Sequence, residues 1–395
     1  MDSNKHNGRI PQLRFPGFEG EWEEKTLADI CNITAGGDAP KQNFSKVKTG
    51  IYNVPVISNG IGENAIYGYT DIPKITQSAV TVAARGTIGY AEYRDYPYYP
   101  IIRLLSVIAK DSTIDTKYLS YLLSVQKYHS TDGGIPQLTV PMIGSTIIPI
   151  PSLLEQRTIA ECLEAIDQMI SAQNQKVESL KAHKKGLMQQ LFPQPGATTP
   201  ALRFPGFAGD WEVKKLGEIA DVNPKSDKLP NKFVYIDLES VESGNLLKKN
   251  IIEVKNAPSR AQRLLKKGDI LFQMVRPYQR NNYHFYDNDG NVYVASTGYA
   301  QIRYKDCSEY LYQYLHTDTF VDIAISKCVG GNYPAINTTD LTNITVYLPS
   351  PAEQQKIAEC LETLDNLIAA ESKKLESLKT HKKGLMQQLF PQPVK

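Results

Sequence analysis

The chain of 395 residues has few cysteines, few histidines and no long apolar stretch. No run of about 18 apolar residues is present, so no transmembrane helix is expected. The N-terminal sequence MDSNKHNGRIPQLRF contains no apolar core of a secretory signal. The cysteine count is odd and no pair is spaced as C-x-x-C, which argues against disulfides; the thiols are Cys31, Cys162, Cys307, Cys328 and Cys360. These absences predict a cytoplasmic protein with reduced thiols and no membrane partner.

The sequence also lacks the common signatures of catalysis and metal binding. It contains no G-x-x-x-x-G-K-[ST] loop, no G-x-G-x-x-G fingerprint and no His/Cys cluster with zinc spacing. Short acid-x-Lys triplets of the kind found in nuclease cores are frequent, as chance predicts for a lysine-rich chain. The stretch DNDGN at residues 287–291 lacks the remaining ligands of a calcium loop. We therefore predict no catalytic residue, no metal and no bound cofactor on this chain.

Neither sign of charge is in excess. The 44 lysines and arginines are balanced by 42 aspartates and glutamates, which leaves a net charge of +2. The overall charge therefore favours no particular class of partner. A hydrophobic content of 41% is typical of a soluble globular protein, and the length predicts two or three domains.

What the chain does contain is an internal duplication. HKKGLMQQLFPQP occurs at 183–195 and again at 381–393, and residues 151–195 match residues 349–393 at 31 of 45 positions. Upstream, LRFPGFEGEW is matched by LRFPGFAGDW, so Trp22 and Trp211 are equivalent. The middles, residues 31–150 and 220–348, share little beyond a Gly-Gly segment. A repeated frame around two different inserts predicts two modules with two specificities.

Each of the two matching segments, residues 151–195 and 349–393, is predicted to be one long helix. Its apolar residues are spaced alternately by four and three, which is the heptad pattern of a coiled coil. Prolines before and after each segment limit the helix. The predicted core of the helix pair is Ile159, Leu163, Ile166, Ile170, Val177 and Leu180 with Ile357, Leu361, Leu364, Ile368, Leu375 and Leu378.

Charge along these helices predicts their relative direction. Residues 155–167 carry a net charge of −3 and residues 176–185 carry +3, and the second copy repeats this pattern. Antiparallel packing places each acidic half beside a basic half. The predicted fold class is therefore α+β, with two globular mixed α/β domains joined by two long antiparallel coiled-coil helices in a pseudo-two-fold repeat. The inserts are expected at opposite ends of this pair. The expected domain boundaries are 1–150, 151–195, 196–348 and 349–395.

Local patterns predict the elements of the inserts. In the first, residues 78–93 alternate as two strands around a turn at Arg85-Gly86, and residues 115–128 have helical spacing. In the second, residues 268–278 are typical of a strand that leads into a loop. Residues 287–296 are typical of a hairpin turn, and residues 308–325 are typical of one helix.

The second insert has a local excess of basic residues. Between residues 257 and 286, lysines and arginines alternate with tyrosines and asparagines, which suits phosphate and base-edge contacts in a DNA groove. A solvated basic face is the alternative. The first insert is neutral, so DNA binding there is expected only by analogy. The predicted DNA contacts are Lys41, Asn59, Arg85, Gln137, Lys266, Lys267, Arg276, Tyr278, Arg280, Asn281, Asn282, Asn332 and Tyr333.

The order of these motifs resembles the specificity (S) subunit of Type I restriction–modification systems. The resemblance is carried by the P-x-x-x-EQ start and KKGLMQQLF end of both long helices, by the LRFPGF-x-G-x-W segment and by the GDILF…VRP strand. It covers essentially the whole chain.

The resemblance implies a non-catalytic subunit whose two target recognition domains each read one half of a bipartite double-stranded DNA target. It implies that the paired helices set the spacer between the halves and dock two modification (M) subunits, which methylate adenine with S-adenosylmethionine. Restriction (R) subunits, which use ATP and magnesium, would join through the M subunits. A two-armed protein-binding scaffold without DNA specificity and a nuclease with a diverged active site are the alternatives.

Overall fold

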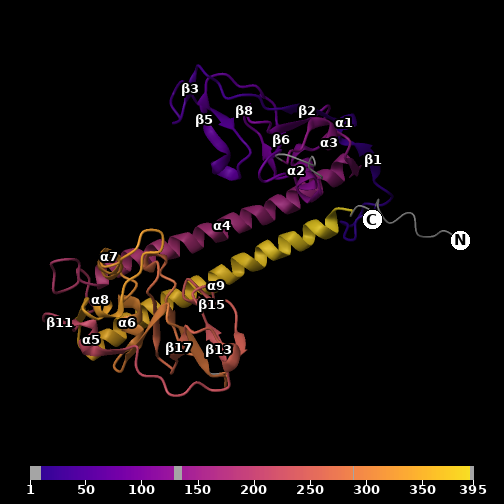
Figure 1. Cartoon of the computed structure of the whole chain (residues 1–395). Coiled ribbons are helices and arrows are strands. Elements are labelled where there is room, and N and C mark those ends of the chain that lie inside the picture. Colours follow the sequence, from indigo (N-terminus) through magenta and orange to yellow (C-terminus); the bar gives the residue numbers. More distant parts are fainter. Residues whose placement is uncertain (1–9, 129–135, 288, 392–395) are drawn as a thin grey trace. The chain divides into compact units, whose positions relative to one another are not determined.

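The computed structural model describes residues 10–128, 136–287 and 289–391 (Figure 1). The chain divides into two compact units, and each contains one insert and parts of both long helices. The first unit combines the residues up to 174 with those from 373 onward, and the second unit comprises residues 175–372. The division between the units therefore lies within both helices.

The first unit has two four-stranded sheets and one strand pair among its described residues. One sheet has the order β2-β9-β6-β7, formed by Cys31–Ala35, Leu105–Ala109, Ala79–Val82 and Ala91–Arg94. The other has the order β3-β5-β4-β8, formed by Phe44–Ser45, Ile66–Thr70, Val54–Ile57 and Tyr99–Pro100. The strand pair is antiparallel and joins β1 (Glu23–Thr26) to β10 (Ile147–Ile150).

The second unit repeats this arrangement. Its first sheet has the order β12-β21-β18-β19, formed by Ala220–Val222, Tyr299–Tyr304, Ile270–Gln273 and Tyr283–His284. Its second sheet has the order β16-β13-β20-β17, formed by Asn250–Glu253, Lys232–Ile236, Tyr293–Ser296 and Ala261–Leu264. Two strand pairs complete it: β11 (Glu212–Lys215) with β22 (Thr345–Leu348), and β14 (Val241–Glu242) with β15 (Asn245–Leu246).

The first sheets of the two inserts have the same strand order, whereas the second sheets share only a central part, because β3 pairs with β5 but β17 pairs with β20. In the second sheet of each unit, the central strand has one parallel and one antiparallel neighbour: β4 pairs with β8 and β5, and β13 pairs with β20 and β16. Many combinations of apolar side chains can fill such a sheet as long as the pattern and volume are kept. The frame, the first sheet and the centre of the second sheet are therefore common to both units, whereas the remaining strands and the side chains on the inserts differ.

Short helices connect the sheets to the frame. In the first unit these are α1 (Leu27–Ile30), α2 (Thr116–Val125), α3 (Val140–Gly144) and the 3-10 turn η1 (Gly62–Ala65). In the second unit they are α5 (Leu216–Ile219), α6 (Ser308–Tyr314), α7 (Asp318–Ser326), α8 (Thr338–Thr342), η2 (Val254–Asn256) and η3 (Pro277–Gln279). The predicted strands within residues 78–93 and 268–278 and the predicted helix within 115–128 are confirmed. Helix α2 begins after Asp115, which accepts a hydrogen bond from the backbone N–H of Tyr118 at 2.9 Å.

Two predictions for the second insert are wrong. Residues 308–325 form α6 and α7 rather than one helix, because Thr317 caps a new helix by accepting from the backbone N–H of Phe320 at 3.3 Å. Residues 287–296, of which 288 lies outside the described residues, are no hairpin turn, since β19 and β20 belong to different sheets. Asp287 and Asp289 both bind the ammonium group of Lys249, at 2.8 and 2.9 Å.

The long helices α4 (Leu153–Leu191) and α9 (Pro351–Leu389) each have 39 residues, or about 58 Å of helix. All twelve predicted core residues are buried or half-buried. In the first unit, Lys382 Nζ lies 2.5 and 2.7 Å from the carboxylate oxygens of Asp167. In the second unit, Lys184 Nζ lies 2.6 and 2.7 Å from those of Asp365. The acidic half of one helix thus lies beside the basic half of the other in both units, which confirms the antiparallel direction.

The repeated motifs of the frame contact one another inside each unit. The Arg14 guanidinium donates two hydrogen bonds to Glu155, both at 2.8 Å, and Arg203 donates two to Glu353, at 2.7 and 2.8 Å. Both carboxylates are almost fully buried, at 2% and 1% exposure. The arginine of LRFPGF therefore pairs with the glutamate of EQ in each copy, which explains why both segments are repeated.

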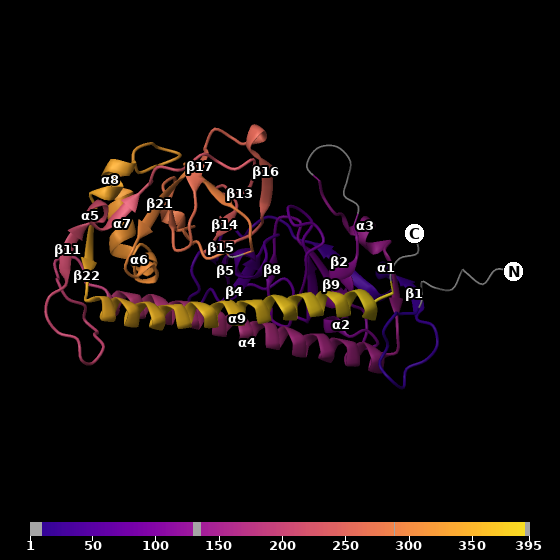
Figure 2. The ribbon, with the colours of Figure 1, turned by 90° about the horizontal axis from the view of Figure 1, so that it is seen from below.

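Aromatic packing also repeats between the units. Trp22 packs edge-on against Tyr118, with ring centroids 6.3 Å apart, and Trp211 packs in the same way against Tyr310 at 6.2 Å. Helix α2 lies beside the N-terminal part of α4 (Figure 2), where Lys117 pairs with Glu164 at 2.6 Å. The core of each insert is thus continuous with the helix pair in its own unit.

Candidate DNA interface

Arg85 and Gln137, which the sequence predicts separately, are in contact. Arg85 Nε and Nη2 donate to Oε1 of Gln137 at 2.9 and 2.6 Å. The neighbouring backbone is also joined, because the N–H of Leu138 donates to the carbonyl of Ala84 at 2.9 Å. Glycines 133 and 134, just before this segment, lie outside the described residues. An arginine oriented by a half-buried amide is a suitable reader of a base edge.

Asn59 is used by the fold of the first insert. Its Oδ1 accepts from the backbone N–H of Ala84 at 2.7 Å, and its Nδ2 donates to the carbonyl of Ile102 at 2.6 Å. The amide therefore positions the loop ends of two sheets and has little hydrogen-bonding capacity left for a base. Lys41, by contrast, lies exposed in the loop before β3.

Arg276 and Tyr333 are brought together in the second insert. The guanidinium carbon of Arg276 lies 4.2 Å from the centroid of the Tyr333 ring, within the range of a cation–π contact. Arg276 has a left-handed backbone, with φ of 55°, and its N–H donates to the carbonyl of Pro334 at 2.7 Å. Tyr333 is 69% exposed, and Asn332 and Tyr278 are exposed as well. Strained backbone of this kind concentrates at binding sites.

Three further predicted contacts, at residues 280–282, have partners within the protein. Arg280 Nη2 forms an ion pair with Asp318 at 2.6 Å, which lowers the pKa of that carboxyl. Asn281 Oδ1 accepts from the backbone N–H of Ser243 at 3.1 Å. Asn282 is 1% exposed and accepts from the backbone N–H of Gln273 at 2.8 Å. The prediction that Asn282 contacts DNA is wrong, because its buried amide cannot reach a ligand.

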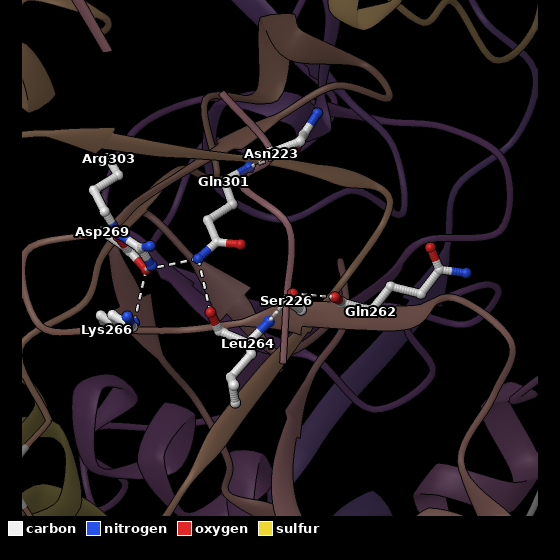
Figure 3. A network of polar contacts seen from close by, with 8 residues as sticks. All are labelled: Asn223, Ser226, Gln262, Leu264, Lys266, Asp269, Gln301 and Arg303. Carbon is white, nitrogen blue, oxygen red and sulfur yellow. Dashed lines mark hydrogen bonds and ion pairs between the residues drawn. The ribbon is translucent and has the colours of Figure 1, made fainter. Parts of the chain in front are cut away.

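Lys266 and Lys267 are exposed on a turn that a buried carboxylate holds in place. Asp269, with no exposed surface, accepts hydrogen bonds at 2.7 Å from the backbone N–H of Lys266, from Gln301 Nε2 and from both Nε and Nη2 of Arg303 (Figure 3). The network fixes the backbone of the turn, on which both lysines are exposed, and Lys267 Nζ lies 5.7 Å from the centroid of the Tyr286 ring. The sequence gives no signal of this role, since an aspartate among lysines resembles a surface residue.

The strand-end arginines Arg85 and Arg276 do not occupy equivalent positions in the two units. Ala84 accepts from Leu138 N, and Met274 accepts from Ile336 N at 3.0 Å, so Ala84 and Met274 occupy corresponding positions. Arg85 therefore corresponds to the valine that precedes Arg276. Each arginine nevertheless follows a strand whose next residues accept from the segment at Leu138 or Ile336, and the two domains differ in side chain at the same place.

The described residues contain no group of three or more histidines, cysteines or acids that could hold a metal ion. Among the described helices, none is both long and apolar enough to cross a membrane.

Comparison with known proteins decides the family. The pattern of the Type I restriction modification DNA specificity domain matches this chain twice, over residues 19–182 and 208–380. The chain belongs to this family. It is thus a Type I restriction–modification specificity subunit with two recognition domains, and its relatives are specificity subunits.

Several individual proteins are similar over most of the chain. The MjaVIII specificity subunit of Methanocaldococcus jannaschii is 27% identical and covers 71% of each chain. The putative MjaX specificity subunit of the same organism is 25% identical over 97% of this chain and 94% of its own. The crystal structure of the S subunit from M. genitalium has the same fold, with a TM-score of 0.63 and 16% identity, and covers 97% of this chain and 100% of that one.

Proposed function

We propose that each recognition domain reads one half of a bipartite double-stranded DNA target. The observation that carries this proposal is the first sheet, which has one strand order in both units but two different sets of side chains at corresponding loops, Arg85 with Gln137 and Arg276 with Tyr333. A common scaffold with different loop residues is what two readers of different sequences require.

The paired helices are proposed to dock two modification subunits and to set the spacer between the half-targets. Near the end of each helix, over residues 183–191 and 381–389, the exposed residues are repeated together with the core. His183 and Lys185 of α4 are exposed, and so are the identical His381 and Lys383 of α9. Packing alone does not require identical exposed residues, whereas binding two copies of one partner does.

The chemistry is proposed to reside on the partners. S-adenosylmethionine is expected on the modification subunits, and ATP and magnesium on restriction subunits that join through them. On this chain we propose no catalytic residue. The alternatives are a two-armed protein-binding scaffold without DNA specificity and a diverged nuclease.

The test is to assemble the chain with the modification subunit of its own system and to map methylated adenines on genomic DNA. The chain alone should neither methylate nor cut. Exchanging residues 31–150 for the matching segment of another specificity subunit should change one half-target and leave the other intact. A complex without sequence preference would favour the scaffold, and cleavage by the chain alone would favour the nuclease.

A further inference from the structure

The loop between β8 and β9, residues 101–104, departs from its counterpart in the second unit. Ala84 and Met274 correspond, and the backbone N–H of each needs an acceptor. Met274 donates to the carbonyl of Gly298, in the loop between β20 and β21, at 3.0 Å. Ala84 instead donates to the Asn59 side chain, at 2.7 Å. In the first unit a side chain therefore replaces the main-chain acceptor of the loop.

The path of the loop explains this replacement. Ile102 and Arg103 both have left-handed backbone, with φ of 54° and 65°, a conformation that such residues rarely adopt. Their N–H groups donate to the carbonyls of Gly37 and Gly36, at 2.8 and 2.9 Å. A side chain at Gly36 is excluded, because its Cβ would lie 2.6 Å from the carbonyl carbon of Pro100. The loop is therefore held in this unusual conformation by the neighbouring backbone.

The Asn59 amide joins the residues that precede two arginines. Its Nδ2 donates to Ile102, immediately before Arg103, and its Oδ1 accepts from Ala84, immediately before Arg85. One planar group thus sets the distance between the backbones that present both guanidinium groups. Arg103 is exposed, and within the described residues its guanidinium has no hydrogen-bond or ion-pair partner.

We infer that Arg103 is a specificity-determining residue of the first recognition domain and reads a base edge beside the position read by Arg85. The inference rests on the proposed function. Two consecutive left-handed residues lower the stability of the fold, and the Arg103 guanidinium makes no hydrogen bond or ion pair among the described residues that would offset this strain. Contact with a ligand therefore accounts for the arrangement. Guanine is the base whose O6 and N7 match a guanidinium.

The test uses the chain assembled with its modification subunit and three variants. Arg103→Gly removes the guanidinium and suits a φ of 65°, so the melting temperature should not fall. Arg103→Lys keeps the charge without the paired donors. Lys25→Ala, on β1, removes one positive charge from the frame of the same unit and serves as the matched control.

For Arg103→Gly we expect loss of discrimination at one base pair of the first half-target and an unchanged second half-target. Binding to a duplex with the full target should weaken roughly 5- to 150-fold. Arg103→Lys should lose the same discrimination with a smaller loss of affinity, and Lys25→Ala should behave as the wild type.

An unchanged motif and affinity for Arg103→Gly would overturn the inference. Equal weakening on target and non-target duplexes would overturn it too, because Arg103 would then contact phosphate. The exchange of residues 31–150 distinguishes a failure of the role of Arg103 from a failure of the proposed function. If that exchange alters the first half-target and Arg103→Gly does not, the role of Arg103 is refuted and the proposed function stands.

Discussion

Arg303 donates two hydrogen bonds to Asp269, from Nε to Oδ1 and from Nη2 to Oδ2, both at 2.7 Å. The pair joins β21 to the turn that carries Lys266 and Lys267. A buried carboxylate is stable only while its partners remain, because an uncompensated buried charge is costly. The position of the turn with the two exposed lysines therefore depends on Asp269, a residue with no exposed surface.

Asp269→Ala should destabilise the second unit by about 3–5 kcal/mol, since it leaves Arg303 and Gln301 without their acceptor. The measurement is urea unfolding followed by the fluorescence of Trp211. A Trp22→Phe background removes the tryptophan of the first unit, so that the signal reports the second unit alone. Glu253→Ala removes an exposed acid from the same insert and should change stability by less than about 0.5 kcal/mol. Equal stability of the two variants would show that the network is dispensable.

Arg276→Ala should relax the second half-target and weaken binding by about 1–3 kcal/mol, if the guanidinium contacts a guanine. Tyr333→Ala should have a smaller effect in the same direction, because the ring holds the guanidinium at 4.2 Å. Methylome mapping with each variant measures both effects. An unaltered motif for Arg276→Ala would remove this residue from the interface.

Lengthening both helices should lengthen the spacer. Four residues inserted after Gln173 in α4 and after Glu371 in α9 add about 6 Å of helix, which a coiled coil absorbs as a stutter. At about 3.4 Å per base pair, the spacer should gain one or two undefined positions with both half-targets unchanged. The control is the same insertion after Gly196, in the turn beyond α4, which leaves the helices as they are. An active complex with an unchanged spacer would refute the role of the helices as a ruler.

Two histidines should make the second unit sensitive to acid. Burial lowers the pKa of His284 and of His316 to about 4, whereas a histidine in the unfolded chain titrates near 6.5. The unfolded state therefore binds more protons between these values. The stability that these two neutral histidines allow is fully present above about pH 6.5 and is lost as the pH falls toward 4.

We expect the free energy of unfolding to fall by about 1–2 kcal/mol per pH unit across this window from the two histidines together. His316→Gln should reduce the slope, as read by Trp211 fluorescence in urea at a series of pH values. His183→Gln, an exposed histidine on α4, should keep the wild-type slope. An unchanged slope for His316→Gln would show that this imidazole is not held neutral by the fold.

The helix pair could be predicted from the sequence because heptad spacing and charge blocks are local patterns. The contacts of the candidate interface depend on residues distant in the chain, and this limited the prediction. Gln301 and Arg303 lie 32 and 34 residues from Asp269, so nothing near Asp269 signals its burial. The prediction for Asn282 is wrong for the converse reason. Its polar neighbours suggest a surface loop, whereas its amide accepts a buried hydrogen bond from the backbone of Gln273. The left-handed backbone of Arg103 also has no local signal, because it is imposed by Gly36, Gly37 and Asn59.

The division of the chain into its two units has a consequence for synthesis on the ribosome. The second unit, residues 175–372, is continuous in sequence, whereas the core of the first includes Leu389 and Phe390 near the end of α9. Translation therefore delivers every residue of the second unit before the first can complete its core. The unit that is synthesised first therefore completes its core last, because residues near the two ends of the chain must come together. Until then its apolar surface remains exposed to solvent.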